Sequence, residues 1–224
     1  VCDALLKLQV VGAGYLPDIT PISPSTPHPP TRTVAPASTV LLVPKSSPSF
    51  PSPSPLTSLL DQTLSLSLPT IPQGTPYADL TNAGSIVVIS QPGGQKCAVL
   101  GGIMAARMRK LGAAGALVDG RVRDLGVLGS LGMPVWSKAT SSIGMAAEAK
   151  AWATDVTVHI GGVDVSPGDL IMLDPEENAA VAIPAGRLDE VLELIPKLVA
   201  ADEKVMKDVE EGVEVKEAFA RHRS

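Results

Sequence analysis

Residues 101–124 read GGIMAARMRKLGAAGALVDGRVRD and combine a helix and a strand in one short run. Apolar residues recur at helical spacing over 102–111, which predicts a helix that begins at the second of two glycines. The apolar residues 116–118 predict a short strand that ends at Asp119-Gly120. A helix followed at once by a strand is typical of an α/β domain, in which ligand sites gather at the ends of strands.

The segments on either side of this run continue the α/β pattern. Apolar and β-branched runs predict strands over 38–43, 85–90, 134–137, 156–160, 169–173 and 179–183. A short helix is predicted over 125–131, and two amphipathic helices, over 187–209 and 215–222, end the chain. We therefore expect one mixed α/β domain over residues 1–224, with many strands in its second half and helices at its C-terminal end.

One part of the chain is unsuited to a packed core. Residues 17–76 hold 15 of the 21 prolines, and residues 46–55 read SSPSFPSPSP. Such a Pro/Ser-rich sequence is typical of extended surface loops, because it can bury too little apolar surface to offset the conformational entropy that the chain loses on folding. We therefore interpret residues 46–72 as a Pro/Ser-rich loop inserted between structured parts. A ligand for a proline-binding module is the alternative.

The composition argues against several classes of protein. A net charge of −5 disfavours nucleic-acid binding, which usually needs a basic face. No apolar run approaches the ~20 residues that cross a bilayer, so no membrane partner is expected. Cys2 and Cys97 form no CxxC motif, which favours a reducing, cytoplasmic setting. The three histidines lie far apart in sequence, which disfavours a His-rich metal site or a Ser-His-Asp triad.

The loop 119–124 carries the residues best suited to chemistry. It places Asp119, Arg121, Arg123 and Asp124 at the end of a predicted strand. A carboxylate oxygen is a hard ligand that suits Mg²⁺ or Mn²⁺. A guanidinium beside it can grip a carboxylate or polarise a carbonyl. Read alone, the same residues also fit a solvated surface loop with an Arg–Asp ion pair.

Gly101 and Gly102 lead directly into the predicted helix. The first turn of a helix carries unpaired N–H groups and the positive end of the helix dipole, and glycine lets a ligand approach the backbone closely. Together these features can hold a carboxylate or a phosphate. The alternative is a tight turn without a ligand. Neither a Gly-Lys-Ser/Thr sequence nor GxGxxG is present here, so this is not a nucleotide-binding loop.

Two further groups of residues are weaker candidates. Lys96, Lys110 and Lys138 have the amine that a Schiff base needs, but no pattern predicts that any of them is buried. The acidic turn at residues 174–177 is interpreted as solvated, and that interpretation includes Asp174.

The run 101–124 as a whole resembles the signature of the 4-hydroxy-4-methyl-2-oxoglutarate aldolase and oxaloacetate decarboxylase family. That family, the RraA-like proteins, also contains the bacterial regulator of ribonuclease E activity. Further segments resemble the same family in the same order: CDALLKL at 2–8, GAGYLP at 12–17, ISQP at 89–92, LGMPV at 131–135, PGDL at 167–170 and DEK at 202–204. The resemblance covers most of the chain outside the Pro/Ser stretch and is closest to the fungal members.

The resemblance implies a swivelling α/β/α-type sandwich that assembles as a homotrimer or hexamer, with the active site at a subunit boundary. It implies a metal-dependent lyase of the class II type that yields pyruvate from a small 2-oxo acid. The reaction would be oxaloacetate decarboxylation, retro-aldol cleavage of 4-hydroxy-4-methyl-2-oxoglutarate, or both. Asp124 would bind the divalent metal, Mg²⁺ or Mn²⁺, Arg123 would contact the substrate and stabilise the pyruvate enolate, and a neighbouring subunit would supply Glu203. The substrate carboxylate would be held by the backbone of Gly101, Gly102, Ile103 and Met104.

Position 102 departs from the family pattern, because many bacterial aldolases of the family carry an acidic residue where this chain has Gly102. One outer carboxylate near the metal is therefore missing. Retro-aldol cleavage also needs a base for the hydroxyl proton, whereas decarboxylation does not, so decarboxylation is the easier reaction here. A non-catalytic binding protein similar to the ribonuclease E regulator is the alternative, and a scaffold recognised through its Pro/Ser loop is a third.

Overall fold

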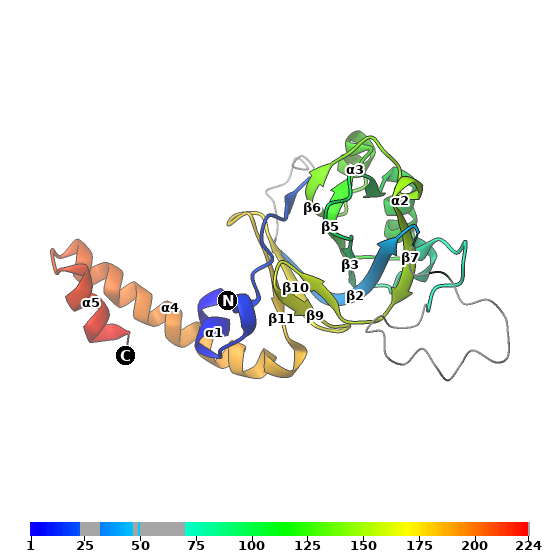
Figure 1. The fold of residues 1–224 in the computed structure, drawn as a ribbon. Helices are drawn as coiled ribbons and strands as arrows, with labels where there is room; N and C mark the ends of the chain where they lie inside the picture. The colour runs from blue at the N-terminus through cyan, green and yellow to red at the C-terminus, as the bar shows by residue number, and fades with distance from the viewer. Residues whose placement is uncertain (23–31, 47–48, 50–69, 224) are drawn as a thin grey trace.

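The computed structural model describes residues 1–22, 32–46, 49 and 70–223, and Figure 1 shows their arrangement. These residues form a large curved sheet, a two-stranded hairpin and a set of helices. Most of the predicted inserted loop at 46–72 lies outside the described residues. Its assignment as an insertion therefore stays a prediction.

The helices and strands have the following bounds. The α-helices are α1 (Cys2–Lys7), α2 (Gly102–Lys110), α3 (Leu125–Ser130), α4 (Leu188–Glu210) and α5 (Val215–His222). Short 3-10 helices are η1 (Val11–Gly14), η2 (Tyr77–Leu80), η3 (Met145–Ala147) and η4 (Ala185–Arg187). The large sheet contains β1 (Thr20–Pro21), β2 (Thr33–Pro44), β3 (Ile86–Ser90), β4 (Ala98–Leu100), β5 (Gly115–Val122), β6 (Val135–Thr140), β7 (Ala149–Thr154), β10 (Leu170–Asp174) and β11 (Ala179–Ile183). The hairpin pairs β8 (Val158–Ile160) with β9 (Val163–Val165).

The large sheet, as far as the structure describes the chain, has the strand order β1-β6-β5-β3-β2-β10-β11. β4 adds to the end of β5, and β7 adds to β2. The central strands β2, β3, β5 and β6 run parallel, whereas β1, β7, β10 and β11 pair antiparallel. The sheet curls into a nearly closed ring, as Figure 1 shows. Helices α2 and α3 therefore begin at the same end of the ring, where the parallel strands β4 and β5 finish.

The central strands are apolar because both faces of the sheet are covered. All five residues of β3 are buried. Val87 and Ile89 share a core cluster with Met108 of α2, whereas Ile86 and Val88 share a second cluster with residues of the β8–β9 hairpin. Alternate residues of a strand point to opposite faces. Helices α2 and α3 thus cover one face, and the hairpin covers the other.

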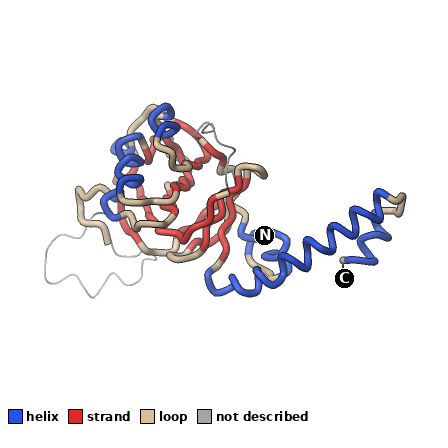
Figure 2. The backbone as a smooth tube through the Cα atoms, turned by 180° about the vertical axis from the view of Figure 1, so that it is seen from behind, coloured by secondary structure: helices blue, strands red, loops and turns tan. Residues whose placement is uncertain are grey.

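The C-terminal helices form an arm that projects from the sheet, as both views show (Figures 1 and 2). Helix α1 packs at the base of α4 and against β11. Helix α5 folds back on α4, and Asp208 Oδ2 lies 3.1 Å from Arg221 Nη1 and 3.0 Å from His222 Nε2. Burial favours the protonated form of Asp208, but hydrogen bonds from His222 and Arg221 outweigh this effect and lower its pKa. No helix among the described residues has the length and apolar composition needed to span a membrane.

The predicted α/β class with C-terminal helices is confirmed. Two strands differ clearly from their predictions: β2 begins at Thr33 rather than at residue 38, and β5 does not end at Asp119-Gly120 but continues to Val122. For β5 the reason is pairing on both sides, because β4 and β6 both pair with the second half of β5 after a register irregularity that begins at Val118. Strands β1, β4, β7 and β9 are additional to the predicted set.

Candidate functional site

Two strand-to-helix connections meet at the edge of the ring and bring the predicted site residues together. The first runs from β4 through Gly101 into α2, and the second from β5 through Arg123 and Asp124 into α3. The backbone N–H of Arg123 donates to the carbonyl of Leu100 at 3.0 Å. The N–H of Gly102 donates to Asp124 Oδ2 at 2.9 Å. The two connections therefore form one unit rather than two separate loops.

Asp124 adopts a left-handed backbone conformation, with φ 62° and ψ 45°, at the position that precedes α3. Asp and Asn tolerate this conformation better than most other residues with a side chain. Its carbonyl accepts the N–H groups of Val127 and Leu128, which starts the helix. The carboxylate is 46% exposed, so it is accessible from solvent while one of its oxygens is anchored to Gly102.

The guanidinium of Arg123 lies beside this carboxylate. Arg123 Nε is 3.9 Å from Asp124 Oδ2, and the Arg123 side chain is about half exposed. The loop that carries Gly144 passes close by, since a Cβ placed on Gly144 would lie 3.3 Å from Arg123 Nη1. Arg121 points elsewhere and donates to the carbonyl of Thr140 at 3.0 Å. Arg123 is thus the guanidinium of the loop that adjoins Asp124.

The predicted carboxylate-binding backbone forms the first turn of α2. Gly101 lies so close to the site that a Cβ there would be 2.9 Å from Asp124 Oδ2. The N–H of Gly102 already donates to Asp124, so fewer than the four predicted backbone groups are free to bind a substrate carboxylate. Ile103, the next residue, is 87% exposed. The N–H groups of Ile103 and Met104 belong to the helix turn in which N–H groups lack an intrahelical partner.

The buried side-chain amide of Gln91 connects β5 to the segment before β4 through hydrogen bonds. Gln91 Oε1 accepts the N–H of Arg121 at 2.9 Å, and Gln91 Nε2 donates to the carbonyl of Cys97 at 2.9 Å. Gly120 is a glycine for this reason, because a Cβ there would lie 2.0 Å from Gln91 Oε1. Glu148 Oε2 accepts the N–H of Cys97 at 2.7 Å, and two backbone hydrogen bonds of this kind lower the pKa of Glu148. No pattern in the sequence pointed to Glu148. Only the resemblance of the ISQP segment pointed to Gln91.

Of the weaker candidates, Lys138 and Asp174 are paired with other residues, whereas Lys96 and Lys110 are exposed. Lys138 forms an ion pair with Asp119, whose side chain is mostly buried. The interpretation of the turn at 174–177 as solvated is wrong for Asp174, which is only 3% exposed and accepts Arg32 Nε at 2.7 Å. The reason is that β2 pairs with β10, which places Arg32, the residue directly before β2, beside the end of β10. Although burial favours the protonated form, the hydrogen bond from Arg32 keeps the pKa of Asp174 below its ordinary value.

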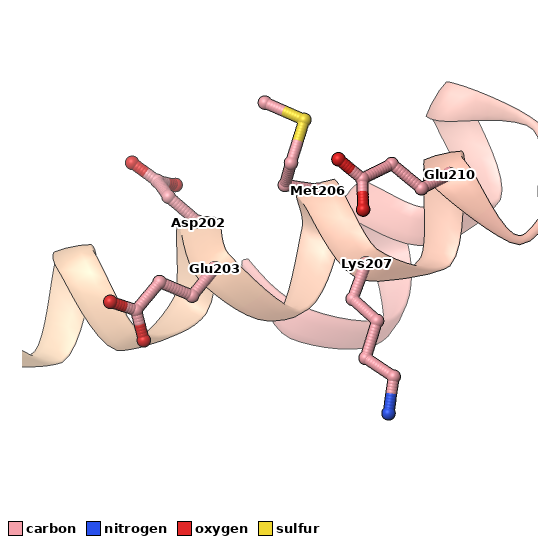
Figure 3. Close-up of a pocket in the computed structure, with 5 residues that line it drawn as sticks. All are labelled: Asp202, Glu203, Met206, Lys207 and Glu210. Atoms are coloured by element: carbon pink, nitrogen blue, oxygen red, sulfur yellow. The ribbon is translucent and has the colours of Figure 1, made fainter.

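Glu203 lies on the projecting arm, away from the ring that carries Arg123 and Asp124 (Figures 1 and 2). Figure 3 shows its carboxylate standing out from α4. It lines a shallow depression together with Asp202, Met206, Lys207 and Glu210. Within a single chain Glu203 therefore does not join the site. Its predicted role depends on a second chain and stays a prediction.

The carboxylate of Asp124 is the donor that the described residues offer to a metal at this site. Among the residues that the structure describes, no group of three or more His, Cys, Asp or Glu side chains could hold a metal ion. Mg²⁺ is commonly bound through one or two carboxylates, with water and substrate oxygens as its other ligands. A single half-exposed carboxylate fits that pattern and does not fit a closed structural metal site.

Solved structures resemble this chain over most of its length. An uncharacterized protein from Pseudomonas syringae pv. tomato str. DC3000 is 23% identical and matches with a TM-score of 0.72 over 98% of this chain and 87% of that chain. Streptomyces coelicolor RraAS2, described as an unusual member of the RNase ES inhibitor RraA protein family, is 24% identical, with a TM-score of 0.66 over 90% of this chain and 88% of that chain.

A more distant structure is the RNA-processing inhibitor RraA from Thermus thermophilis, which is 18% identical, with a TM-score of 0.52 over 75% of this chain and 83% of that chain. At these identities the likeness shows a shared fold. A family model described as RraA-like, Aldolase/RraA, matches residues 1–176. The chain therefore belongs to the RraA-like family.

Proposed function

We propose that this protein is a divalent-metal-dependent lyase that forms pyruvate from a small 2-oxo acid. The observation that carries the proposal is the pairing of the Arg123 guanidinium with the Asp124 carboxylate at the first turn of α2. The substrates proposed are oxaloacetate, by decarboxylation, and 4-hydroxy-4-methyl-2-oxoglutarate, by retro-aldol cleavage. Both reactions build negative charge on the oxygen of a pyruvate enolate, so both need a positive group at that oxygen.

Asp124 would hold the metal, for which we propose Mg²⁺ or Mn²⁺. Its Oδ2 is anchored by Gly102, and no hydrogen bond within the described part of the chain involves Oδ1. When bound, the metal supplies Lewis-acid polarisation of the 2-oxo group. Asp124 would supply a single carboxylate ligand from the chain, which suits a Mg²⁺ site that is completed by water and substrate oxygens.

The other groups of the site have separate tasks in this proposal. Arg123 stabilises the charge that develops on the enolate oxygen, because its guanidinium is always ionised and already lies beside the carboxylate. The N–H groups of Ile103 and Met104 bind the substrate carboxylate at the positive end of α2. No lysine is required as a Schiff base, and Lys138 is already paired with Asp119.

Assembly and location complete the proposal. Because Glu203 lies on an arm that projects from its own chain, it would reach the site of a second copy in a homotrimer or hexamer. We infer a cytoplasmic setting, because Cys2 and Cys97 are both free thiols.

A non-catalytic regulatory role is the second candidate. Two structural neighbours are described as an RNase ES inhibitor family member and an RNA-processing inhibitor. The half-exposed state of Arg123 and Asp124 is also what a surface ion pair would show.

Pyruvate formation distinguishes the two roles. The full chain is incubated with oxaloacetate at a fixed Mg²⁺ concentration, with and without excess EDTA, and pyruvate is followed against a solution of free Mg²⁺. If the protein is a lyase, we expect pyruvate to form faster than with free Mg²⁺ alone, and we expect EDTA to abolish this additional rate. A rate equal to that of free Mg²⁺ contradicts the lyase proposal and favours the binding role. The same assay with 4-hydroxy-4-methyl-2-oxoglutarate ranks the two substrates.

A further inference from the structure

Gly102, the first residue of α2, is a glycine because of the space around it. Its φ lies outside the left-handed region, so the backbone conformation does not require glycine. A Cβ placed on Gly102 would lie 2.8 Å from Val127 Cγ1 and 2.9 Å from Val127 Cβ. Carbon atoms in contact prefer separations of about 3.5–4.0 Å. Any side chain at position 102 therefore collides with Val127 unless one of the two moves.

The space that Val127 fills borders the carboxyl group of Asp124. The same Cβ on Gly102 would lie 3.4 Å from Asp124 Cβ, so a carboxylate at position 102 would stand beside that of Asp124. Val127 is held in the first turn of α3, where its N–H donates to the carbonyl of Asp124 at 2.9 Å. Val127 thus keeps a second carboxylate out of the site.

Exposed apolar side chains occur on the elements that carry the charged pair. Ile103 is 87% exposed in the first turn of α2, and Leu125 and Val127 are 42% and 47% exposed in the first turn of α3. Ile143 is also exposed, in the loop that passes the guanidinium of Arg123. A single exposed apolar residue is ordinary. Val127 is the one among them that borders the position of a side chain at Gly102 beside Asp124, so its half-exposed side chain gives the site an apolar wall.

We propose that Val127 is a specificity-determining residue of this site. It limits the site to one carboxylate and contributes an apolar wall, and both effects favour decarboxylation of a 2-oxo acid over retro-aldol cleavage. The reaction preference rests on the function proposed above, whereas the exclusion of a second carboxylate rests on packing alone.

The chemistry of the two reactions explains the preference. In oxaloacetate the bond between C3 and C4 breaks, and its electron pair forms the double bond between C2 and C3 while the carbonyl pair moves to the oxygen on C2. Carbon dioxide leaves, and water then supplies the proton at C3. The C4 carboxylate loses its charge in this step, which an apolar wall favours. Retro-aldol cleavage needs a base for the hydroxyl proton, and neither Val127 nor Ile103 offers one.

Packing is tested first, by thermal unfolding. Gly102→Ala is expected to lower the melting temperature by at least about 4 °C when Val127 is present. In a Val127→Ala background the same change should lower it by less than about 2 °C, because the space is then free. Gly126→Ala is the matched control, since a Cβ there meets nothing within 4 Å. An equal loss for Gly102→Ala in both backgrounds overturns the proposal.

Metal affinity is tested next, by calorimetric titration with Mn²⁺ in the absence of substrate. The double variant Gly102→Asp with Val127→Ala is expected to bind Mn²⁺ about tenfold more tightly than Val127→Ala alone, because it adds an oxygen ligand. Equal affinities of the two variants overturn the claim that Val127 excludes a second ligand.

Reaction preference is tested last, from initial rates with oxaloacetate and with 4-hydroxy-4-methyl-2-oxoglutarate. The ratio of decarboxylation to cleavage is expected to fall at least about tenfold in the double variant. An unchanged ratio in a double variant that binds Mn²⁺ more tightly overturns the role of the apolar wall. If the wild-type chain forms no pyruvate from either acid, the proposed function fails. The melting temperatures and Mn²⁺ affinities still decide whether Val127 excludes a second carboxylate.

Discussion

Gly120→Ala should destabilise the fold through one buried side chain. A Cβ at position 120 would lie 2.0 Å from Gln91 Oε1 and 2.7 Å from Gln91 Cβ, so Gln91 must leave its place. Its displacement breaks the hydrogen bonds to Arg121 N–H and Cys97 O and leaves both groups without that partner. An unsatisfied buried group costs about 1–3 kcal/mol. We therefore expect the free energy of unfolding to fall by about 2–4 kcal/mol.

Urea unfolding with two further variants makes this expectation specific. Gln91→Ala removes the same two hydrogen bonds, so the double variant should cost at least about 1 kcal/mol less than the sum of the single changes. Gly126→Ala, with no atom within 4 Å of its added Cβ, should not lower the free energy of unfolding, because alanine is the better helix former at this position of α3. Strict additivity of Gly120→Ala and Gln91→Ala, or a Gly120→Ala cost as small as that of Gly126→Ala, would refute the reasoning.

Two further predictions concern the support of β4 and the arm. Tyr77→Phe should lower the free energy of unfolding by about 1–3 kcal/mol, because the buried hydroxyl donates to the carbonyl of Val99 at 2.5 Å; urea unfolding measures this, and no change would contradict it. The ionised carboxylate of Asp208 stabilises the α4–α5 hairpin at pH values above 3.8, the ordinary pKa of an aspartate. This stabilisation is lost as the pH falls through the lowered pKa that Asp208 has in the folded state. Hydrogen-exchange protection factors of α5 should therefore fall with acid below about pH 4 in the wild type, and Asp208→Asn should remove that dependence, whereas an identical acid response in the variant would contradict it.

Much of the fold was predictable because its elements have strong local patterns. The buried run of β3 has no polar residue before Ser90, and α5 has the bounds that its amphipathic pattern predicts. Strands β1, β4 and β9 were missed because strands of two or three residues carry almost no periodicity, and β7 was missed because Ala149–Thr154 mixes lysine and alanine with one tryptophan. These strands are stabilised by their neighbours in the sheet rather than by their own composition.

The candidate site was predictable where its residues are consecutive. Arg123 and Asp124 follow one strand, and Gly102 begins the helix after another, so each half of the site is visible in one short run. The contacts between distant segments were not predictable. Three contacts depend on how the strands associate: the close approach of Val127 to Gly102, the packing of Gln91 against Gly120, and the pairing of Asp174 with Arg32.

The carboxylate of Asp124 offers the most direct test of the proposed metal-dependent lyase. Asp124→Asn retains the left-handed backbone, which Asn also tolerates, and removes the negative charge. The matched control is Asp155→Asn, because Asp155 is also exposed and has a φ of 56°. The measurement is kcat/KM for Mg²⁺-dependent pyruvate formation from oxaloacetate, with the melting temperature of each variant as a check on folding. We predict a fall of at least about 100-fold for Asp124→Asn and none for Asp155→Asn. A rate near that of the wild type in a folded Asp124→Asn variant would contradict the role of Asp124 and, with it, the proposed site.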